Sequence, residues 1–198
     1  FSEVFNDEND LLKFTQFILT RCFLVVVSTP NQESAFRVFS VMNSRGLDLL
    51  PTDIIKSMTI GKLPKDEEQK YTEKWEELEN LTGRDGFNEV FTHTRTIFAK
   101  ERPKKNLLDE FKEYVIKQTS PKSLVDEYLI PYTEAYVCLK NCDFSSTQNA
   151  EEINELLLWL NKTNNHDWMP PAIKFLTDHK NDSVYILWFL SLIHISEP

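Results

Sequence analysis

Glycine is scarce in this sequence: only four glycines occur in 198 residues, against about 7% of residues in an average protein. This scarcity disfavours an all-β protein with many tight turns. Basic residues are also too few to balance the acidic ones, since 22 lysines and arginines face 31 aspartates and glutamates. The net charge of −9 argues against general nucleic-acid binding by the chain as a whole.

Cysteines and long apolar runs are also few. The three cysteines, Cys22, Cys138 and Cys142, form no even disulfide framework, and no signal-peptide pattern opens the chain. These features predict a reducing, cytoplasmic setting. The longest apolar runs, at residues 23–27 and 184–195, are shorter than the ~20 residues that span a bilayer. We therefore expect no membrane association.

What the sequence does contain is a series of helical patterns. Apolar residues recur at helical spacing in residues 9–22, and every periodic segment after Pro64 also predicts a helix. Pro131 is expected to kink or break its helix, because it removes a backbone donor and clashes one turn back. The other expected helix boundaries are Gly83, Asn106, Ser120-Pro121 and Trp168 to Pro171. A further helix is expected to begin at Asn149, which forms a predicted capping box with Glu152.

One short segment predicts a strand. Residues 23–27 are apolar and rich in β-branched side chains, which is typical of a buried strand. A lone strand cannot satisfy its backbone hydrogen bonds, so its partners are expected upstream of residue 1. The predicted fold class is therefore mostly α: a small α/β remnant at residues 1–62, followed by a helical bundle at residues 63–190.

The best candidate site is a polar corner between two predicted helices. Arg45 offers a planar guanidinium to phosphate oxygens, and Asn43 offers an amide to a phosphate or a metal-bound water. In the alternative interpretation, the corner is an ordinary helix-ending turn in which Arg45 pairs with Asp48 or Asp53. The candidate site residues are Asn43, Ser44, Arg45 and Gly46.

The helices on either side of the corner have their own start signals. Thr29 and Gln32 form a predicted capping box that opens the first helix, and Thr52 or Asp53 is expected to cap the second. Asp53 and Lys56 are expected to orient the corner through local pairing rather than to perform chemistry.

The corner and its flanks resemble a known family. The pattern Phe36-x-x-Phe39, Asn43-Ser44-Arg45-Gly46-x-x-Leu49, Asp53-x-x-Lys56 is similar to the family called domain of unknown function 262. That family is the N-terminal, ParB/sulfiredoxin-like part of GmrSD-type modification-dependent restriction and anti-phage defence proteins. The resemblance extends over roughly residues 8–190, through Trp75-Glu76-x-Leu78-Glu79, Phe91-Thr92-His93-Thr94-Arg95, Leu108-x-x-Phe111-Lys112 and Asp167-Trp168-x-Pro170-Pro171-Ala172.

The resemblance implies a middle piece of a bacterial defence protein. Residues 1–62 would be the C-terminal part of a ParB-like nucleotide-binding domain, and residues 63–190 a helical bundle domain. In the intact protein, residues 43–46 would contact a nucleoside triphosphate with Mg²⁺. The family's upstream Asp-Gly-Gln-Gln-Arg-type motif and its C-terminal HNH-like nuclease do not occur in this sequence. Residues 191–198 resemble translated sequencing-adapter read-through and are expected to be a non-native tail.

The resemblance also implies a role and partners. We expect this chain to be non-catalytic, to bind no cofactor by itself, and to act with a nuclease domain or subunit. DNA would be contacted only through the intact protein. The rival hypothesis is a helical protein-interaction scaffold with no ligand, which predicts an exposed apolar patch. A stand-alone nuclease would need clustered His, Asp or Glu ligands.

The remaining candidates favour structural roles. The four histidines have no ligand spacing, and Cys138-x-x-x-Cys142 lacks the second pair that a zinc site requires. The basic segment at residues 100–105 either touches a phosphate backbone or is a solvated loop. Trp168 with the prolines after it predicts a packing corner. We expect no catalytic residue and no metal site.

Overall fold

The computed structural model describes residues 8–23, 26, 28, 50–163 and 165–196, and the chain divides into two compact units, Phe1–Asp48 and Leu49–Pro198. In the first unit, α1 (Glu8–Arg21) confirms the helix predicted for residues 9–22. Its apolar side chains are exposed, with Leu12 at 67% and Leu19 at 79%. Within the described residues, α1 therefore has an apolar surface open to solvent.

The predicted buried strand is not seen where it can be checked. Phe23 and Val26 have no regular secondary structure and are 91% and 92% exposed. The prediction is wrong at these two residues, because an apolar, β-branched run gives a strand only where partner strands accept its backbone hydrogen bonds. Leu24, Val25 and Val27 lie outside the described residues, as do the capping box at Thr29 and the helix it was predicted to open.

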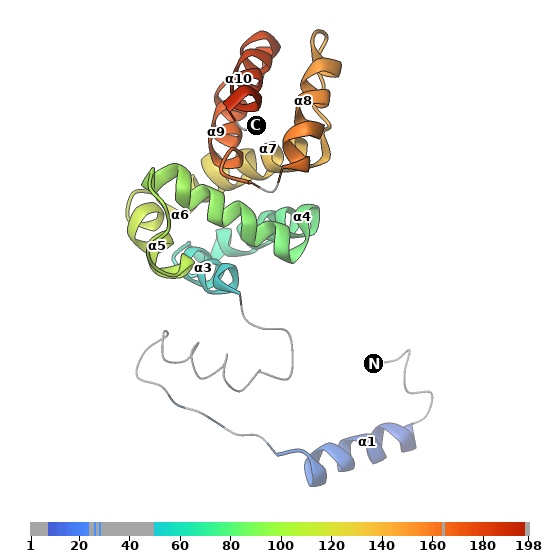
Figure 1. The fold of residues 1–198 in the computed structure, drawn as a ribbon. Coiled ribbons are helices and arrows are strands. Elements are labelled where there is room, and N and C mark those ends of the chain that lie inside the picture. Colours follow the sequence, from blue (N-terminus) through green and yellow to red (C-terminus); the bar gives the residue numbers. More distant parts are fainter. Residues whose placement is uncertain (1–7, 24–25, 27, 29–49, 164, 197–198) are drawn as a thin grey trace. The chain divides into compact units, whose positions relative to one another are not determined.

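The second unit is helical, as predicted, and no strand occurs among its described residues. None of the helices in the described ranges combines the length and apolarity that crossing a bilayer requires. The α-helices are labelled in Figure 1. In chain order the elements are α3 (Pro51–Ile60), α4 (Lys65–Ala99), α5 (Leu107–Phe111), the π-helical turn η1 (Lys112–Ile116), α6 (Pro121–Ser123), the π-helical turn η2 (Leu124–Leu129), α7 (Ile130–Asn141), α8 (Ala150–Lys162), α9 (Met169–Asp178) and α10 (Ser183–Ser196).

The long helix α4 consists of two arms that meet at Gly83. Gly83 has φ 70° and ψ 167°, a backbone conformation that is essentially restricted to glycine. The two helices predicted on either side of this residue are therefore both present. Their junction lets the first arm pack with α3 and the second arm run between two hydrophobic clusters.

The first cluster is built around four aromatic rings. Trp75 and Phe87 meet edge to face with centroids 5.6 Å apart, Phe87 and Phe91 do the same at 5.1 Å, and Phe91 lies 4.9 Å from Phe111. All four side chains are at most 1% exposed. Aromatic pairs at these separations add to the stabilisation from burial itself. The cluster joins α3, α4, α5 and the helical segment up to residue 129.

The second cluster joins α7, α8, α9 and α10 to the second arm of α4. Val90 is a fully buried residue of α4 in this cluster, while Phe87 and Phe91 of the same helix belong to the first cluster. A helix that is apolar on two faces is buried on both. The second arm of α4 thus links the two halves of the unit.

Two predicted helix starts are confirmed and one differs. The Asn106 side chain accepts a hydrogen bond from the backbone N–H of Asp109 at 2.9 Å, and the Ser120 hydroxyl accepts one from Ser123 at 3.1 Å. Helix α8 also begins where predicted, but Asn149 has φ 60° and its side chain makes no capping hydrogen bond. The left-handed backbone of Asn149 does not suit a capping side chain, so the predicted capping box is wrong although the helix begins at the predicted place.

Pro131 does not end its helix. The chain passes from the π-helical turn η2 into α7 and stays helical through Pro131, which occupies the first turn of α7. A proline inside a continuous helix removes one backbone donor and crowds the carbonyl one turn back, and the π-helical turn directly before Pro131 has a wider backbone spacing that relieves this crowding. The wider turn of η2 therefore accommodates the proline that was expected to break the helix.

Helix α3 belongs to the second unit. This unit begins at Leu49, and α3 packs against α4 and α5. The sequence had placed the domain boundary after residue 62, with this helix in the preceding domain. Ile55 of α3 is fully buried in the first cluster, so apolar packing attaches α3 to the bundle.

Candidate functional site

The predicted phosphate corner, Asn43, Ser44, Arg45 and Gly46, lies outside the described residues. Its role stays a prediction. The structure does describe the segment that leaves the corner, beginning at Leu50 and continuing into α3. This segment contains Asp53 and Lys56, the residues of the pattern that follow the corner.

Asp53 ties the start of α3 to α4. Its Oδ2 atom accepts a hydrogen bond from the backbone N–H of Leu50 at 2.9 Å and from Nη2 of Arg84 at 2.9 Å. Both charged side chains are 30% exposed. Asp53 thus caps the helix from its third position, while the N-cap residue is Leu50 and Thr52 is buried. The prediction that Thr52 or Asp53 is the N-cap is therefore wrong, because Pro51 already begins the helix and both residues lie inside its first turn.

Lys56, the other charged residue of the pattern, also pairs with α4. Its Nζ atom lies 3.0 Å from Oε1 of Glu76. The local pairing expected for Asp53 and Lys56 is replaced by contacts to two residues of α4, since α3 lies along that helix. These contacts hold the segment that follows the corner in a fixed place on the bundle.

The basic segment at residues 100–105 is largely neutralised by its own surroundings. Lys104 lies 2.7 Å from Glu101, and Lys105 lies 2.8 Å from Glu113. Arg102 is 94% exposed and lies 3.9 Å from Asp167. With three of its four cations beside a carboxylate, the segment carries little net positive charge for a phosphate backbone, which favours the loop interpretation.

The histidines do not assemble a metal site within the described ranges, where no group of three or more His, Cys, Asp or Glu side chains could hold a metal ion. His93 instead lies beside the ring of Tyr136, at 6.0 Å between centroids. Burial lowers the pKa of His93 to about 4; His166 and Lys140 lower it further, while Glu89 opposes them. His93 is therefore neutral at pH 7.

Trp168 is 2% exposed in the second cluster, as expected of a packing corner.

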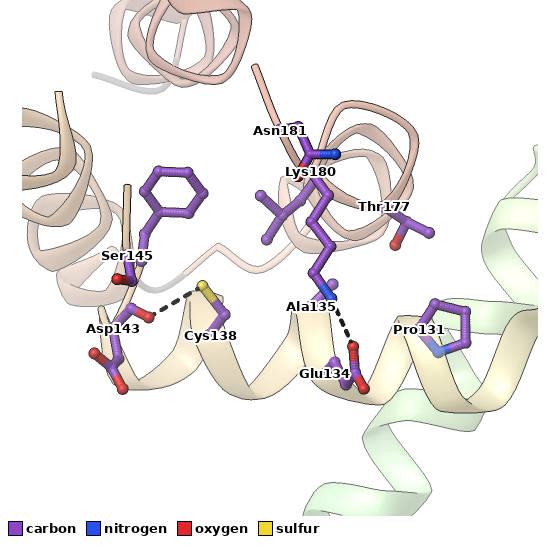
Figure 2. A pocket seen from close by; sticks show the side chains of 11 residues that line it. Pro131, Glu134, Ala135, Cys138, Asp143, Ser145, Thr177, Lys180 and Asn181 are labelled. Atoms are coloured by element: carbon purple, nitrogen blue, oxygen red, sulfur yellow. Dashed lines mark hydrogen bonds and ion pairs between the residues drawn. The ribbon is translucent and has the colours of Figure 1, made fainter. Parts of the chain in front are cut away.

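A cavity that no sequence pattern predicts lies between α7, α9 and the loop after α7. Its volume is about 390 Å³, within the range of small-molecule sites. Residues of α7 line one wall at helical spacing, and the end of α9 lines the opposite wall (Figure 2). The lining residues are Pro131, Glu134, Ala135, Cys138, Asp143, Phe144, Ser145, Leu176, Thr177, Lys180 and Asn181.

The loop that borders this cavity is held by asparagines of α8. Asn154 accepts a hydrogen bond from the backbone N–H of Phe144 at 2.8 Å and donates one to its carbonyl at 2.9 Å. Asn161 donates to the carbonyl of Leu139 at 2.8 Å, near the end of α7. Phe144 is 7% exposed as a result. The rim of the cavity is thus preformed.

The polar groups of the cavity include one ion pair and one thiol. Nζ of Lys180 lies 2.9 Å from Oε2 of Glu134, across the space between α9 and α7 (Figure 2). The Cys138 thiol donates to the carbonyl of Asp143 at 3.5 Å. Burial, with smaller effects of Asp143 and Cys142, raises the pKa of Cys138 to about 11. The thiol is therefore protonated at neutral pH and is a poor nucleophile.

Comparison of the chain with protein-family models, with curated proteins and with solved structures finds no match.

Proposed function

We propose that this chain is a non-catalytic part of a bacterial nucleotide-binding defence protein that regulates a DNA nuclease. In this proposal Asn43, Ser44, Arg45 and Gly46 contact the phosphates of a nucleoside triphosphate with Mg²⁺ in the intact protein. The helical unit holds the segment that follows them. The nuclease is a separate domain or subunit, and DNA is reached through it.

The observation that carries the proposal is the double contact of Asp53. Asp53 and Lys56 are the charged residues that end the family-like pattern, and both attach the segment after the corner to α4. Arg84, which binds Asp53, directly follows the glycine junction of α4. Asp53 thus connects the start of α3 to the joint between the two arms of α4.

The test is a calorimetric titration of GTP, ATP and CTP, each with Mg²⁺, into a chain extended upstream to include the Asp-Gly-Gln-Gln-Arg-type motif. We expect one nucleotide to bind, Arg45→Ala to abolish binding, and Asp53→Asn to weaken it. Lys105→Gln, on the neutralised basic segment, is the matched control and should bind normally. Absence of binding by all three nucleotides, or normal binding by Arg45→Ala, would refute the phosphate role.

A second candidate function, a protein-interaction scaffold, is supported by exposed apolar side chains. On α8, Leu158 and Trp159 are 52% and 51% exposed, and on α10, Val184, Tyr185 and Trp188 are 55–59% exposed. Residues 184–195 contain no charged side chain other than a histidine. Apolar surface of this kind on a helix commonly marks an interaction site.

Sedimentation velocity distinguishes this candidate from the first. A scaffold should self-associate or bind a partner through α10, and Trp188→Glu should abolish that association without changing nucleotide binding. The control is Glu151→Lys, an exposed change on α8 that also alters the charge. The scaffold would be contradicted if the chain sediments as a monomer alone and also does so when the proposed nuclease partner is added.

A further inference from the structure

We propose that the cavity between α7 and α9 binds a small zwitterion of the α-amino-acid class with an apolar side chain. The proposal rests on the volume of the cavity, on its apolar lining and on the pair of opposite charges that faces it. It uses none of the residues of the predicted phosphate corner and is independent of the nucleotide proposal.

The apolar part of the lining suits a hydrophobic side chain. Pro131 and Ala135 come from α7, Leu176 from α9, and Phe144 from the rim loop. Pro131 is available there because η2 accommodates it within a continuous helix. A cavity of about 390 Å³ can enclose most of a small ligand, and ligand sites typically combine such a lining with a few oriented polar groups.

The ion pair of Glu134 and Lys180 selects the charge of the ligand. Their side chains are 51% and 72% exposed and 2.9 Å apart, and exposed pairs of this kind are held weakly. A ligand with a single charge would engage one member and leave the other to solvent, so the contact that it gains only offsets the ion pair that it breaks. An α-amino acid carries both charges a few ångströms apart, so its carboxylate can bind Lys180 while its ammonium binds Glu134.

Other groups favour the same orientation. Asp143 adds a second carboxylate to the rim, two residues after the C-terminal end of α7, where the helix dipole is negative. Thr177 donates its hydroxyl hydrogen to the carbonyl of Ile173 at 2.9 Å, so its oxygen can accept from an ammonium. The amide of Asn181 can donate to a carboxylate.

The rim requires little rearrangement on binding. Asn154 fixes Phe144 through both of its backbone groups, and Cys138 fixes the carbonyl of Asp143. A preformed site loses little conformational entropy when its ligand binds. The only change that the proposal requires is the opening of one surface ion pair.

The test is titration calorimetry of the full chain with L-phenylalanine and L-leucine, compared with N-acetyl-phenylalanine and phenylalanine amide. We expect saturable binding of a free amino acid, and affinity at least about tenfold lower for each capped derivative, because each lacks one charge. Glu134→Gln and Lys180→Gln should each weaken binding by a similar factor. Lys174→Gln is the matched control, since Lys174 pairs with Asp178 on the same helix but does not line the cavity.

A second variant separates loss of the site from loss of the fold. Thr177→Phe places a ring in the cavity and should abolish binding while the melting temperature and the helical circular dichroism stay close to those of the unaltered chain. The proposal is overturned if neither free amino acid binds saturably, if the capped derivatives bind as well as phenylalanine, or if binding survives in Lys180→Gln and Glu134→Gln.

Discussion

Arg95 of α4 and Glu110 of α5 form an ion pair inside the bundle, with Nε of Arg95 2.5 Å from Oε2 of Glu110 and side chains that are 1% and 2% exposed. The same guanidinium donates to the carbonyls of residues 101–102, at 2.5 and 3.3 Å. Glu110 accepts the backbone N–H groups of residues 104–105, at 2.7 and 2.8 Å. Burial acts to raise the pKa of Glu110, but these N–H groups and Arg95 hold it below its usual value. The pair therefore anchors the whole loop between α4 and α5.

Removing Arg95 should destabilise the bundle strongly. Arg95→Met leaves the Glu110 carboxylate buried without its partner, and breaking a buried pair in this way costs about 3–5 kcal/mol. Urea unfolding at neutral pH measures this loss. Lys105→Met removes the exposed pair with Glu113 and should change stability little. Equal losses in the two variants would show that the buried pair contributes no more than a surface pair.

His93 should make stability depend on pH. Its pKa is about 4 in the folded chain, against 6.5 for the ordinary group. Between these values the unfolded chain binds a proton that the folded chain does not, so stability is complete above about pH 6.5 and falls as the pH drops toward 4. The expected loss is about 2–3 kcal/mol over this window, at roughly 1.4 kcal/mol per pKa unit.

Urea unfolding at a series of pH values measures this dependence. His93→Gln should flatten the curve between pH 4 and 6.5, whereas His194→Gln, at an exposed position, should leave it unchanged. If both variants retain the slope of the unaltered chain, carboxylates rather than His93 are responsible for it.

Gly83→Ala should strain the junction of α4. Nothing lies within 4 Å of the added Cβ atom, so the effect comes from the backbone alone. A non-glycine residue at φ 70°, ψ 167° costs on the order of 1–3 kcal/mol. Thermal unfolding should show the decrease, while Asn80→Ala, three residues earlier in the same arm, should change stability little. A neutral Gly83→Ala would mean that the two arms can join as one regular helix.

Phe91→Ala should cost about 3–5 kcal/mol, because it removes a fully buried ring and leaves a cavity among three other aromatic side chains. Phe91→Leu should cost less, since it refills part of the space. Near-ultraviolet circular dichroism should also weaken, because Trp75 lies 5.3 Å from Phe91. Leu81→Ala, at a side chain that is 55% exposed, is the control. A small loss in Phe91→Ala would indicate that the cluster repacks freely.

The helices of the second unit could be predicted because their signals are local. Asn106 caps a residue three positions away, Ser120 does the same, and Gly83 interrupts α4 through its own backbone angles. Two such local signals gave a different result in the structure. Asn149 adopts a left-handed backbone in place of a capping geometry, and the π-helical turn before Pro131 accommodates that proline within the helix.

The sequence by itself determined the helical character, most helix boundaries and the composition of the apolar faces, since each depends on residues within one or two turns of one another. Only the tertiary structure decided which charges meet. Asp53 binds Arg84, 31 residues away, and Glu134 binds Lys180, 46 residues away. Such pairs, and the cavity beside the second one, exist only because packing of the apolar faces brings distant helices together, and no local pattern encodes that contact.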